Sequence, residues 1–418
     1  MPKQFSLISL GCFRNTYDSE IIAQRFLGEG YQLLRNESSR RRQYPEVLIL
    51  NTCGFIDAAK KESIEAIREA VSLKKKGKIK KLIVCGCLVA RYRVELAKEF
   101  REVDDWNGIE GFPQGAYHRP LLSPAWRAFL KICEGCVNRC SYCAIPLIKG
   151  PLRSRAEEDI LTEVRFLNTP GIRELNIIGQ DITSWGKDLG GPYTLARLLK
   201  KILAASPAIG WIRLIYTHPA HITDELIDLI ARERRICKYI DMPIQHSNDR
   251  ILQLMNRPMS AAGVRKLIDT VRQRIPGVTL RTSVIVGFPG ETEKDFKELL
   301  NFLKEVQFEH LGAFIYSREL DTPAYDFTPQ VHPATKKRRF EELMRQQKEI
   351  AARCNQRFIG KKITVLIEEK QQDVYVGRTQ FDAPEVDGAV FLKTKRLRIG
   401  EFYNATITDA YEYDLMGE

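Results

Sequence analysis

The sequence of 418 residues lacks any run of 18 or more apolar residues, the length that a membrane-spanning helix requires. Its first residues, MPKQFSLISLGC, contain one lysine and no long apolar stretch, so they are expected to form a strand and not a secretory signal. We therefore expect a cytoplasmic protein. Because the cytosol keeps thiols reduced, the ten cysteines are not expected to form disulfide bonds, and clustered cysteines in such a chain indicate metal binding or catalysis.

Charge is distributed unevenly along the chain. The net charge is +12, which suits a nucleic-acid partner and equally an ordinary basic surface. Residues 360–418 hold eight Lys or Arg and eleven Asp or Glu, so their net charge is −3 and that of the remaining chain is +15. An acidic segment fits a phosphate backbone poorly and a basic protein partner better, although a solvated face without a partner has the same composition.

The first segment, residues 1–119, repeats one pattern three times: an apolar strand, a cysteine beside a glycine or turn residue, and a helix. The pattern predicts an open, parallel α/β domain. Cys12, Cys53 and Cys87 lie at the three strand ends, where open α/β sheets bind ligands, so the three thiols are expected to converge. The alternative is that they are small buried core residues, as we interpret Cys85.

Two further segments follow the linker GFPQGAYHRPLLSP, whose prolines and glycines predict a domain boundary. Residues 125–354 alternate six apolar strands with helices and predict an α/β barrel or partial barrel, with polar residues gathered at one end of the strands. Residues 357–418 alternate apolar and polar residues between turn signals and predict a small all-β module.

The stretch CEGCVNRCSYCAIP contains four cysteines: Cys133, Cys136, Cys140 and Cys143. Zinc sites usually separate their cysteine pairs by about 15–20 residues, whereas only three residues separate the pairs here, so an iron–sulfur cluster is favoured. Four thiolates would close the cluster, as in an electron carrier. The alternative is that only three thiolates bind, all from the loop that follows the strand ending at Cys133. One iron of the cluster would then remain open for chemistry. A zinc-stabilised protein and an iron–sulfur carrier stay as alternatives.

The spacing CxxxCxxC, with Tyr142 before its last cysteine and at the first barrel strand, resembles the radical-SAM superfamily. The resemblance implies that Cys136, Cys140 and Cys143 hold a 4Fe–4S cluster, that its open iron binds S-adenosylmethionine (SAM), and that Cys133 is a spare thiol. No residue beyond the cluster ligands is expected to be catalytic.

The whole chain is similar to the methylthiotransferases, which join an N-terminal domain with a second cluster, a radical-SAM barrel and a C-terminal TRAM β-domain. The resemblance implies that Cys12, Cys53 and Cys87 hold the second 4Fe–4S cluster. In the stretch CFRN the sequence departs from the family, which more often has Pro-Lys after the cysteine.

Four stretches, NTCGFIDAAKKES, EGCVNRCSYCAIPLIKGPLRSR, GQDITSWGKDLGG and FDAPEVDGAVFLKT, resemble the RimO branch of that family. This branch modifies an aspartate of the small-subunit ribosomal protein numbered twelve; the other modifies a tRNA adenosine and typically has Asn in place of Asp181. The resemblance implies that a 5′-deoxyadenosyl radical removes hydrogen from the aspartate β-carbon, which then receives sulfur from the second cluster. It also implies a reductant such as flavodoxin or ferredoxin, and a basic ribosomal protein docked on the acidic C-terminal domain. A tRNA methylthiotransferase is the nearest alternative.

Several residues near strand ends are expected to contact SAM or substrate: Tyr142, Gln180, Asp181, Gly287, Pro289 and Gly290. The two glycines would let the backbone approach the adenosyl group closely, and an ordinary tight turn is the alternative. His218 and His246 also follow strands, and we interpret both as structural.

Overall fold

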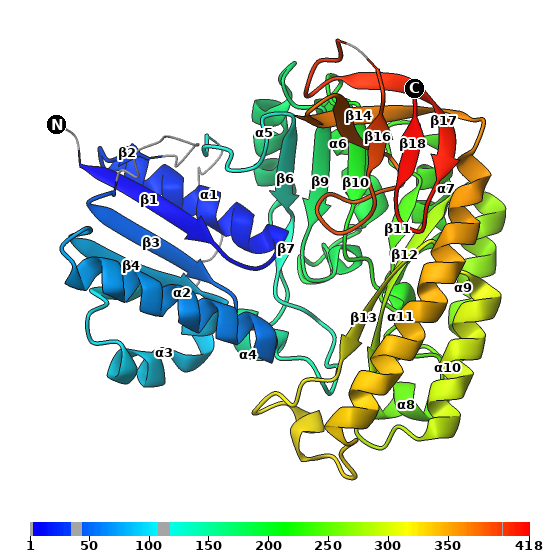
Figure 1. The fold of residues 1–418 in the computed structure, drawn as a ribbon, viewed down its shortest axis with the longest axis horizontal. Coiled ribbons are helices and arrows are strands. Elements are labelled where there is room, and N and C mark those ends of the chain that lie inside the picture. Colours follow the sequence, from blue (N-terminus) through cyan, green and yellow to red (C-terminus); the bar gives the residue numbers. More distant parts are fainter. Residues whose placement is uncertain (1–2, 35–43, 108–117, 395) are drawn as a thin grey trace.

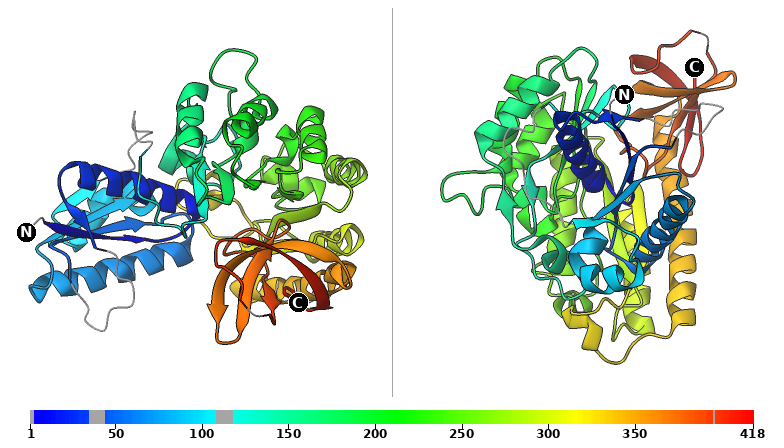
Figure 2. Two further views of the ribbon diagram at one scale, coloured as in Figure 1. Left: turned by 90° about the horizontal axis from the view of Figure 1, so that it is seen from above. Right: turned by 90° about the vertical axis from the view of Figure 1, so that its left-hand side faces the viewer.

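A parallel sheet in the order β2-β1-β3-β4-β5 forms the N-terminal domain of the computed structural model, which describes residues 3–34, 44–107, 118–394 and 396–418 (Figure 1). Its elements are β1 (Gln4–Ser9), α1 (Phe13–Gly28), β2 (Gln32–Leu33), β3 (Val47–Thr52), α2 (Asp57–Lys75), β4 (Lys81–Gly86), α3 (Cys87–Glu99) and β5 (Asp105–Asn107). Every residue of β3 is buried, because Val47 and Ile49 pack with α1 while Leu48 and Leu50 pack with α2 and α3. Helices therefore cover both faces of the sheet (Figure 2).

Six parallel strands form the central domain, in two sheets of order β10-β9-β6 and β11-β12-β13. The strands are β6 (Arg127–Lys131), β9 (Glu174–Ile178), β10 (Trp211–Leu214), β11 (Tyr239–Asp241), β12 (Thr279–Val286) and β13 (His310–Ile315). A single parallel bridge between Ile212 and Ile236 links the sheets, so the strands curve into a partial barrel.

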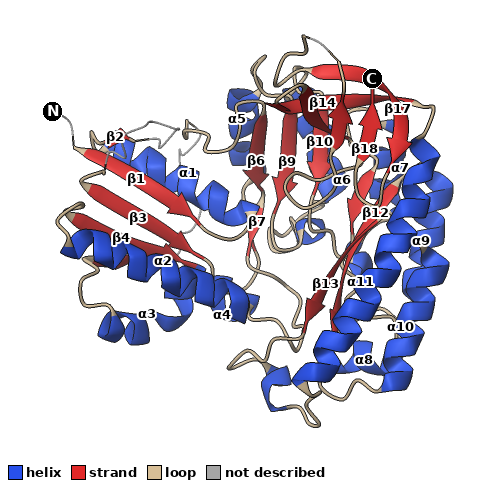
Figure 3. Ribbon diagram, in the orientation of Figure 1, coloured by secondary structure: helices blue, strands red, loops and turns tan. Residues whose placement is uncertain are grey.

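Amphipathic helices cover the outside of this barrel (Figure 3). They are α5 (Glu157–Leu167), α6 (Leu195–Ala205), α7 (Asp224–Arg232), α9 (Ala261–Arg274), α10 (Glu293–Val306) and α11 (Pro333–Asn355), with the shorter α4 (Ile145–Lys149) and α8 (Asp249–Leu254) and 3-10 helices at Ile182–Ser184, Pro219–His221, Pro323–Asp326 and Gln356–Phe358. The hydroxyls of Thr194, Thr223 and Thr292 each accept a hydrogen bond from the third backbone amide of α6, α7 and α10, respectively, which fixes where these helices begin.

A small closed β-barrel of order β14-β15-β16-β18-β17 forms the C-terminal domain. Its strands are β14 (Lys362–Gln371), β15 (Val374–Thr379), β16 (Val390–Leu392), β17 (Phe402–Ala410) and β18 (Leu415–Gly417). It packs on the strands of the central barrel near their amino ends, where the Trp211 and Phe402 rings pack at a tilt and Arg213 donates to the carbonyl of Gln380. The C-terminal domain therefore does not cover the carboxyl ends of the strands, which lie at the lower side of Figure 1.

Buried ion pairs fix α1 of the N-terminal domain against the central barrel. Arg119 donates to Glu20 of α1 at 2.8 Å and also bonds Glu163 of α5, and all three side chains are fully buried. Asp18 of α1 pairs with Lys149 at 3.1 Å. Since breaking one partner of such a pair leaves an uncompensated buried charge, these contacts hold the two domains in one arrangement.

The predicted fold class is confirmed in each of its three parts. All three strand–cysteine–helix units form, and six parallel strands follow in the central barrel. The predicted linker lies partly outside the described residues, which omit 108–117. Across the described ranges, no helix combines the length and apolar character needed to cross a bilayer.

Candidate functional site

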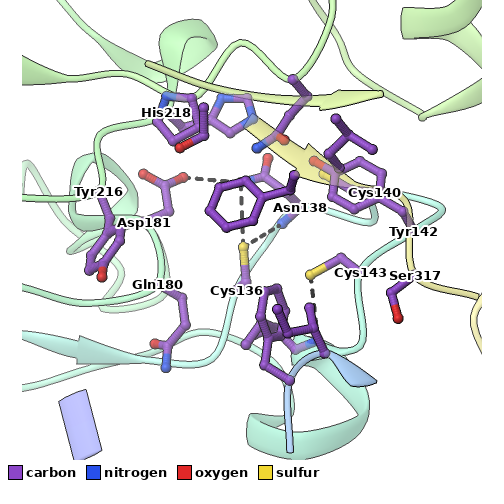
Figure 4. A pocket seen from close by; sticks show the side chains of 18 of the residues that line it. Cys136, Asn138, Cys140, Tyr142, Cys143, Gln180, Asp181, Tyr216, His218 and Ser317 are labelled. Carbon is purple, nitrogen blue, oxygen red and sulfur yellow. Dashed lines mark hydrogen bonds between the residues drawn. The ribbon is translucent and has the colours of Figure 1, made fainter. Parts of the chain in front are cut away.

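The loop that carries Cys136, Cys140 and Cys143 leaves the barrel after β6 and ends at α4. The two-residue strand β7 (Cys133–Glu134) precedes the loop. It pairs with β8 (Arg153–Ser154) and closes the base of the loop. Gly135 makes this possible: it has φ +74°, and a Cβ there would lie 2.0 Å from the carbonyl oxygen of Pro151. The Cys136 and Cys143 side chains point into the pocket of Figure 4.

Polar N–H groups surround the sulfur atoms of this loop. The backbone and side-chain amides of Asn138 both donate to Cys136 Sγ at 3.4 Å, and the Ile145 amide donates to Cys143 Sγ at 3.4 Å. Burial, with the neighbouring Cys140, raises the pKa of Cys143 to about 12. A buried thiol of this kind becomes a thiolate when a metal binds it, and N–H groups then stabilise the charge on sulfur, as they do around iron–sulfur clusters.

Cys133 does not take part in this pocket. Its thiol is fully buried in β7, 3.6 Å from the carbonyl oxygen of Asp181, and a Cβ on Gly179 would lie 2.6 Å from its sulfur. The thiol therefore packs against the turn after β9, while the three loop cysteines line the cavity.

The three N-terminal cysteines come from separate turns that pack directly on one another. A Cβ on Gly11 would lie 2.7 Å from Cys53 Cβ, and a Cβ on Gly54 would lie 2.7 Å from Leu88 Cα. Only glycine fits contacts this short, so the turns at Cys12, Cys53 and Cys87 are held together.

Asn15, in the first turn of α1, connects these turns. Its side-chain Nδ2 donates to the carbonyls of Leu10 at 2.7 Å and Thr52 at 3.1 Å. Its side-chain Oδ1 accepts from Cys87 Sγ at 3.7 Å. Burial raises the pKa of Cys87 to about 12. Although burial opposes it, the guanidinium of Arg14 holds the pKa of Cys12 below its usual value.

Within the described residues, no three His, Cys, Asp or Glu side chains are placed to share one metal ion. A cubane cluster makes a different demand, because each thiolate binds its own iron.

One cavity of about 400 Å³ is lined by the three loop cysteines and by Cys12, whereas Cys53 and Cys87 do not line it. Cys12, Phe55 and Ile56 of the N-terminal domain line it together with the cysteine loop and the carboxyl ends of the barrel strands. Tyr216 after β10 and Gln245 both line the cavity with φ of 69°, a conformation that is costly for residues with side chains. Such strain concentrates at functional sites.

Asp181 is the most heavily hydrogen-bonded side chain of the cavity wall. It accepts from Asn138 Nδ2 at 3.0 Å and Ser184 Oγ at 2.7 Å, and it lies 2.7 Å from His221 Nδ1. Burial opposes ionisation, but these bonds hold the pKa of Asp181 well below its usual range. Gln180 also lines the cavity and donates to Glu134 at 3.2 Å. Asp181 thus couples the barrel wall to the cysteine loop (Figure 4).

The structure does not bring every expected contact into the cavity. Tyr142, Gln180 and Asp181 line it, whereas Gly287, Pro289 and Gly290 do not. A Cβ on Gly287 would lie 2.3 Å from Lys336 Cγ, so this turn packs against α11. His246 also lies away from the cavity. His218 lines it, and its Nε2 has no hydrogen-bond partner among the described residues.

Sequence reasoning missed several cavity residues: Arg14, Asn138, Tyr216, Gln245, Arg257, Ser283, Ile285 and Tyr316. Most follow strands or flank the cysteines, and that position in the sequence was the available signal.

About half of the acidic residues of the C-terminal domain form ion pairs, several of them with the central domain. Of the eleven in 360–418, these six form ion pairs: Glu368, Asp382, Glu385, Asp387, Glu401 and Glu412. Asp387, for example, pairs with Arg281 of β12 at 3.2 Å, and Glu401 pairs with Arg173. The net charge of −3 therefore includes acidic groups that are already paired within the chain, and docking of a substrate on this domain stays a prediction.

Three family models match the chain. Residues 4–108 match an uncharacterized protein family, UPF0004, residues 130–303 match the radical SAM superfamily, and residues 359–418 match the TRAM domain. Fold and site together thus define a radical-SAM protein with an additional N-terminal cysteine domain.

Curated relatives match the entire chain. "Ribosomal protein uS12 methylthiotransferase RimO" of Desulforamulus reducens is 44% identical and covers 100% of this chain and 99% of the relative. The proteins of the same name from Thermoanaerobacter sp. and Phocaeicola vulgatus are 43% and 42% identical, over 100% and 98% of this chain and 100% and 97% of the relatives. The chain belongs to the RimO family of radical-SAM methylthiotransferases. The predicted family and enzyme class are confirmed.

Solved structures share the fold. The radical SAM methyltransferase TsrM from Kitasatospora setae, with cobalamin and a [4Fe-4S] cluster bound, has a TM-score of 0.57 at 14% identity over 78% of this chain and 77% of TsrM. The cobalamin-dependent SAM radical enzyme OxsB has a TM-score of 0.54 at 12% identity, over 84% and 56% of the two chains.

Proposed function

We propose that this chain transfers a methylthio group to the β-carbon of an aspartate in ribosomal protein uS12. The observation that carries the proposal is that the three loop cysteines and Cys12, from different domains, line one cavity of about 400 Å³. A transfer that joins a carbon radical to sulfur needs both centres to reach the same target atom. The relatives named for this activity cover the full length of the chain.

Both triads fit a 4Fe–4S cluster. Cys136, Cys140 and Cys143 would hold the first, and Cys12, Cys53 and Cys87 the second. The supporting observation is the donor set itself: half-buried thiols with N–H donors at Cys136 and Cys143, and close-packed turns around Cys53. When bound, the clusters and SAM would supply the radical and the sulfur that no side chain of the protein offers.

The remaining groups of the site bind, orient and exclude water. Asp181, ionised and anchored by Ser184, would hold Asn138 and with it the loop cysteine that Asn138 contacts. Phe314, Ile315 and other apolar side chains of the cavity wall would keep water from a reactive radical. Tyr142 packs with the apolar cluster of Ile285 and Phe288 and would shape the SAM side of the cavity.

The substrate is a basic ribosomal protein, so we also propose a cytoplasmic location and an electron donor such as flavodoxin or ferredoxin. If the substrate docks on the C-terminal domain, it would use acidic side chains that the central barrel leaves exposed, Glu369, Asp373 and Asp409. The domain limits that we propose are 1–119, 125–354 and 357–418.

The test uses anaerobically reconstituted protein with SAM, a reductant and sulfide. One reaction receives uS12 and another receives unmodified tRNA, and mass spectrometry analyses both. We expect a methylthio group on one aspartate of uS12 and none on the tRNA. Modification of the tRNA with uS12 untouched would overturn the substrate assignment and leave the family chemistry in place.

A further inference from the structure

We propose that Arg14 recognises the carboxylate of the target aspartate and thereby positions its β-carbon. The inference rests on the proposed function and names the residue that selects its substrate. Arg14 lies in the first turn of α1, directly after Cys12, and it lines the cavity between the two cysteine sites.

Three contacts fix the guanidinium of Arg14. Its Nε donates to Cys12 Sγ at 3.4 Å, its Nη1 donates to the carbonyl of Gly179 at 3.3 Å, and its carbon lies 4.5 Å from the centre of the Tyr216 ring. Gly179 and Tyr216 belong to the strand ends of the central barrel, so Arg14 spans both domains. Tyr216 holds its left-handed conformation, φ 69°, at this point of contact.

Arg14 is half-buried and, like Arg257 of the same cavity, has no carboxylate partner among the described residues, unlike the fully buried arginines. Arg119 pairs with Glu20, and Arg213 pairs with Glu174, each within 2.8 Å. Among the residues that the structure describes, Arg14 forms no ion pair with Asp or Glu, and only two of the five N–H groups of a guanidinium have acceptors. One edge of the guanidinium faces the Cys12 sulfur, and the N–H groups that have no acceptor remain for an anion that enters the cavity from outside.

The chemistry of the target identifies that anion. In an aspartate side chain the β-carbon is bonded directly to the carboxylate carbon, so fixing the carboxylate fixes the carbon that reacts. The planar guanidinium can bind a carboxylate through two parallel hydrogen bonds, which sets its orientation as well as its position. The amino end of α1, where Arg14 lies, also favours an anion.

Arg257 provides the matched comparison. It lines the same cavity, but its Nη2 donates to the carbonyl of Pro243 at 2.7 Å and its Nη1 lies 3.7 Å from Cys140 Sγ. It thus stands at the barrel cysteines, away from the contact between the domains. Arg257 is expected to support the barrel loop and not to read the target carboxylate.

The experiment measures binding of two peptides by calorimetry to the anaerobically reconstituted enzyme with SAM. One peptide spans the target aspartate of uS12, and the other carries asparagine at that position. The unchanged enzyme is expected to bind the aspartate peptide about tenfold to a hundredfold more tightly, the range for a charge-assisted hydrogen-bonded pair. In R14Q this ratio should fall to about one. R14K keeps the positive charge but lacks the planar guanidinium with its paired N–H donors, so it should restore part of the preference for the aspartate peptide.

R257Q should leave the ratio unchanged, even if it alters the barrel cluster. Iron and sulfide contents are measured in parallel, so a lost cluster is recognised separately. An unchanged ratio in R14Q, or an equal loss for both peptides, would overturn the assignment. If the enzyme discriminates the peptides through Arg14 but never methylthiolates the aspartate, the proposed function fails while the recognition site stands.

Discussion

The two cysteine sites bring three thiols together in different ways. The barrel site takes Cys136, Cys140 and Cys143 from a single loop, so its geometry depends on local hydrogen bonds such as those from Asn138 to Cys136. The N-terminal site takes its thiols from three turns distant in sequence, so its geometry depends on how β1, β3 and β4 pack. The geometry of the barrel site is therefore expected to depend mainly on contacts within its loop. The geometry of the N-terminal site is expected to change when any one of its three turns shifts.

The largest expected effect separates the two sites by function. Cys140→Ala should abolish both 5′-deoxyadenosine formation and methylthiolation, because the proposed SAM-binding cluster is lost. Cys53→Ala should abolish methylthiolation alone. Each variant should retain about four of about eight irons per chain. Chromatography of SAM products and iron analysis check this, and loss of SAM cleavage in Cys53→Ala would contradict the division of roles.

The next prediction tests the dependence on packing. Gly54→Ala would place a Cβ 2.7 Å from the backbone of Leu88, which must shift. We expect a loss of about 1–3 kcal/mol in stability and a loss of iron from the N-terminal site only. Thermal unfolding and iron analysis measure both. Gly28→Ala is the control, since nothing lies within 4 Å of its Cβ position, and it should change neither.

A smaller effect concerns pH and the barrel site. Burial and the nearby Arg257 lower the pKa of His218 to about 3, whereas an unfolded histidine has a pKa of about 6.5. Below pH 6.5 the unfolded chain binds a proton that the folded chain does not, so stability is complete above this pH and falls as the pH decreases. The contribution of His218 to the slope is at most about 1.4 kcal/mol per pH unit.

Urea unfolding of the metal-free protein at pH 6.5 and pH 5 measures the slope. His218→Gln should reduce it by about half, because burial also lowers the pKa of His246 to about 3 and that residue contributes in the same way. The described part of the N-terminal sheet domain, residues 3–34 and 44–107, contains no histidine, so hydrogen exchange should show that this domain responds less to the same change. An equal response of both domains would contradict the assignment to His218.

The sequence predicted the N-terminal site because the ends of neighbouring parallel strands must meet at one sheet edge. It did not predict that the turn at Gly287 packs against Lys336, because a glycine in a turn looks the same whether it faces a ligand or a helix. Arg14 stands beside a predicted ligand, yet only the fold shows that its guanidinium reaches Gly179 of another domain. Composition likewise counts acidic residues but does not show that Asp387 faces Arg281.

The smallest expected effect settles whether the barrel site uses three thiols or four. Cys133 is fully buried and contacts the turn at Gly179, so Cys133→Ala should cost about 1 kcal/mol and leave the iron content and SAM cleavage unchanged. Cys237→Ala, at a thiol that is 1% exposed, is the matched control for the loss of a buried sulfur. If Cys133→Ala alone lost about four irons, a fourth thiolate would close the barrel cluster. The barrel site would then not depend on a single loop of three cysteines, because one of its ligands would come from β7.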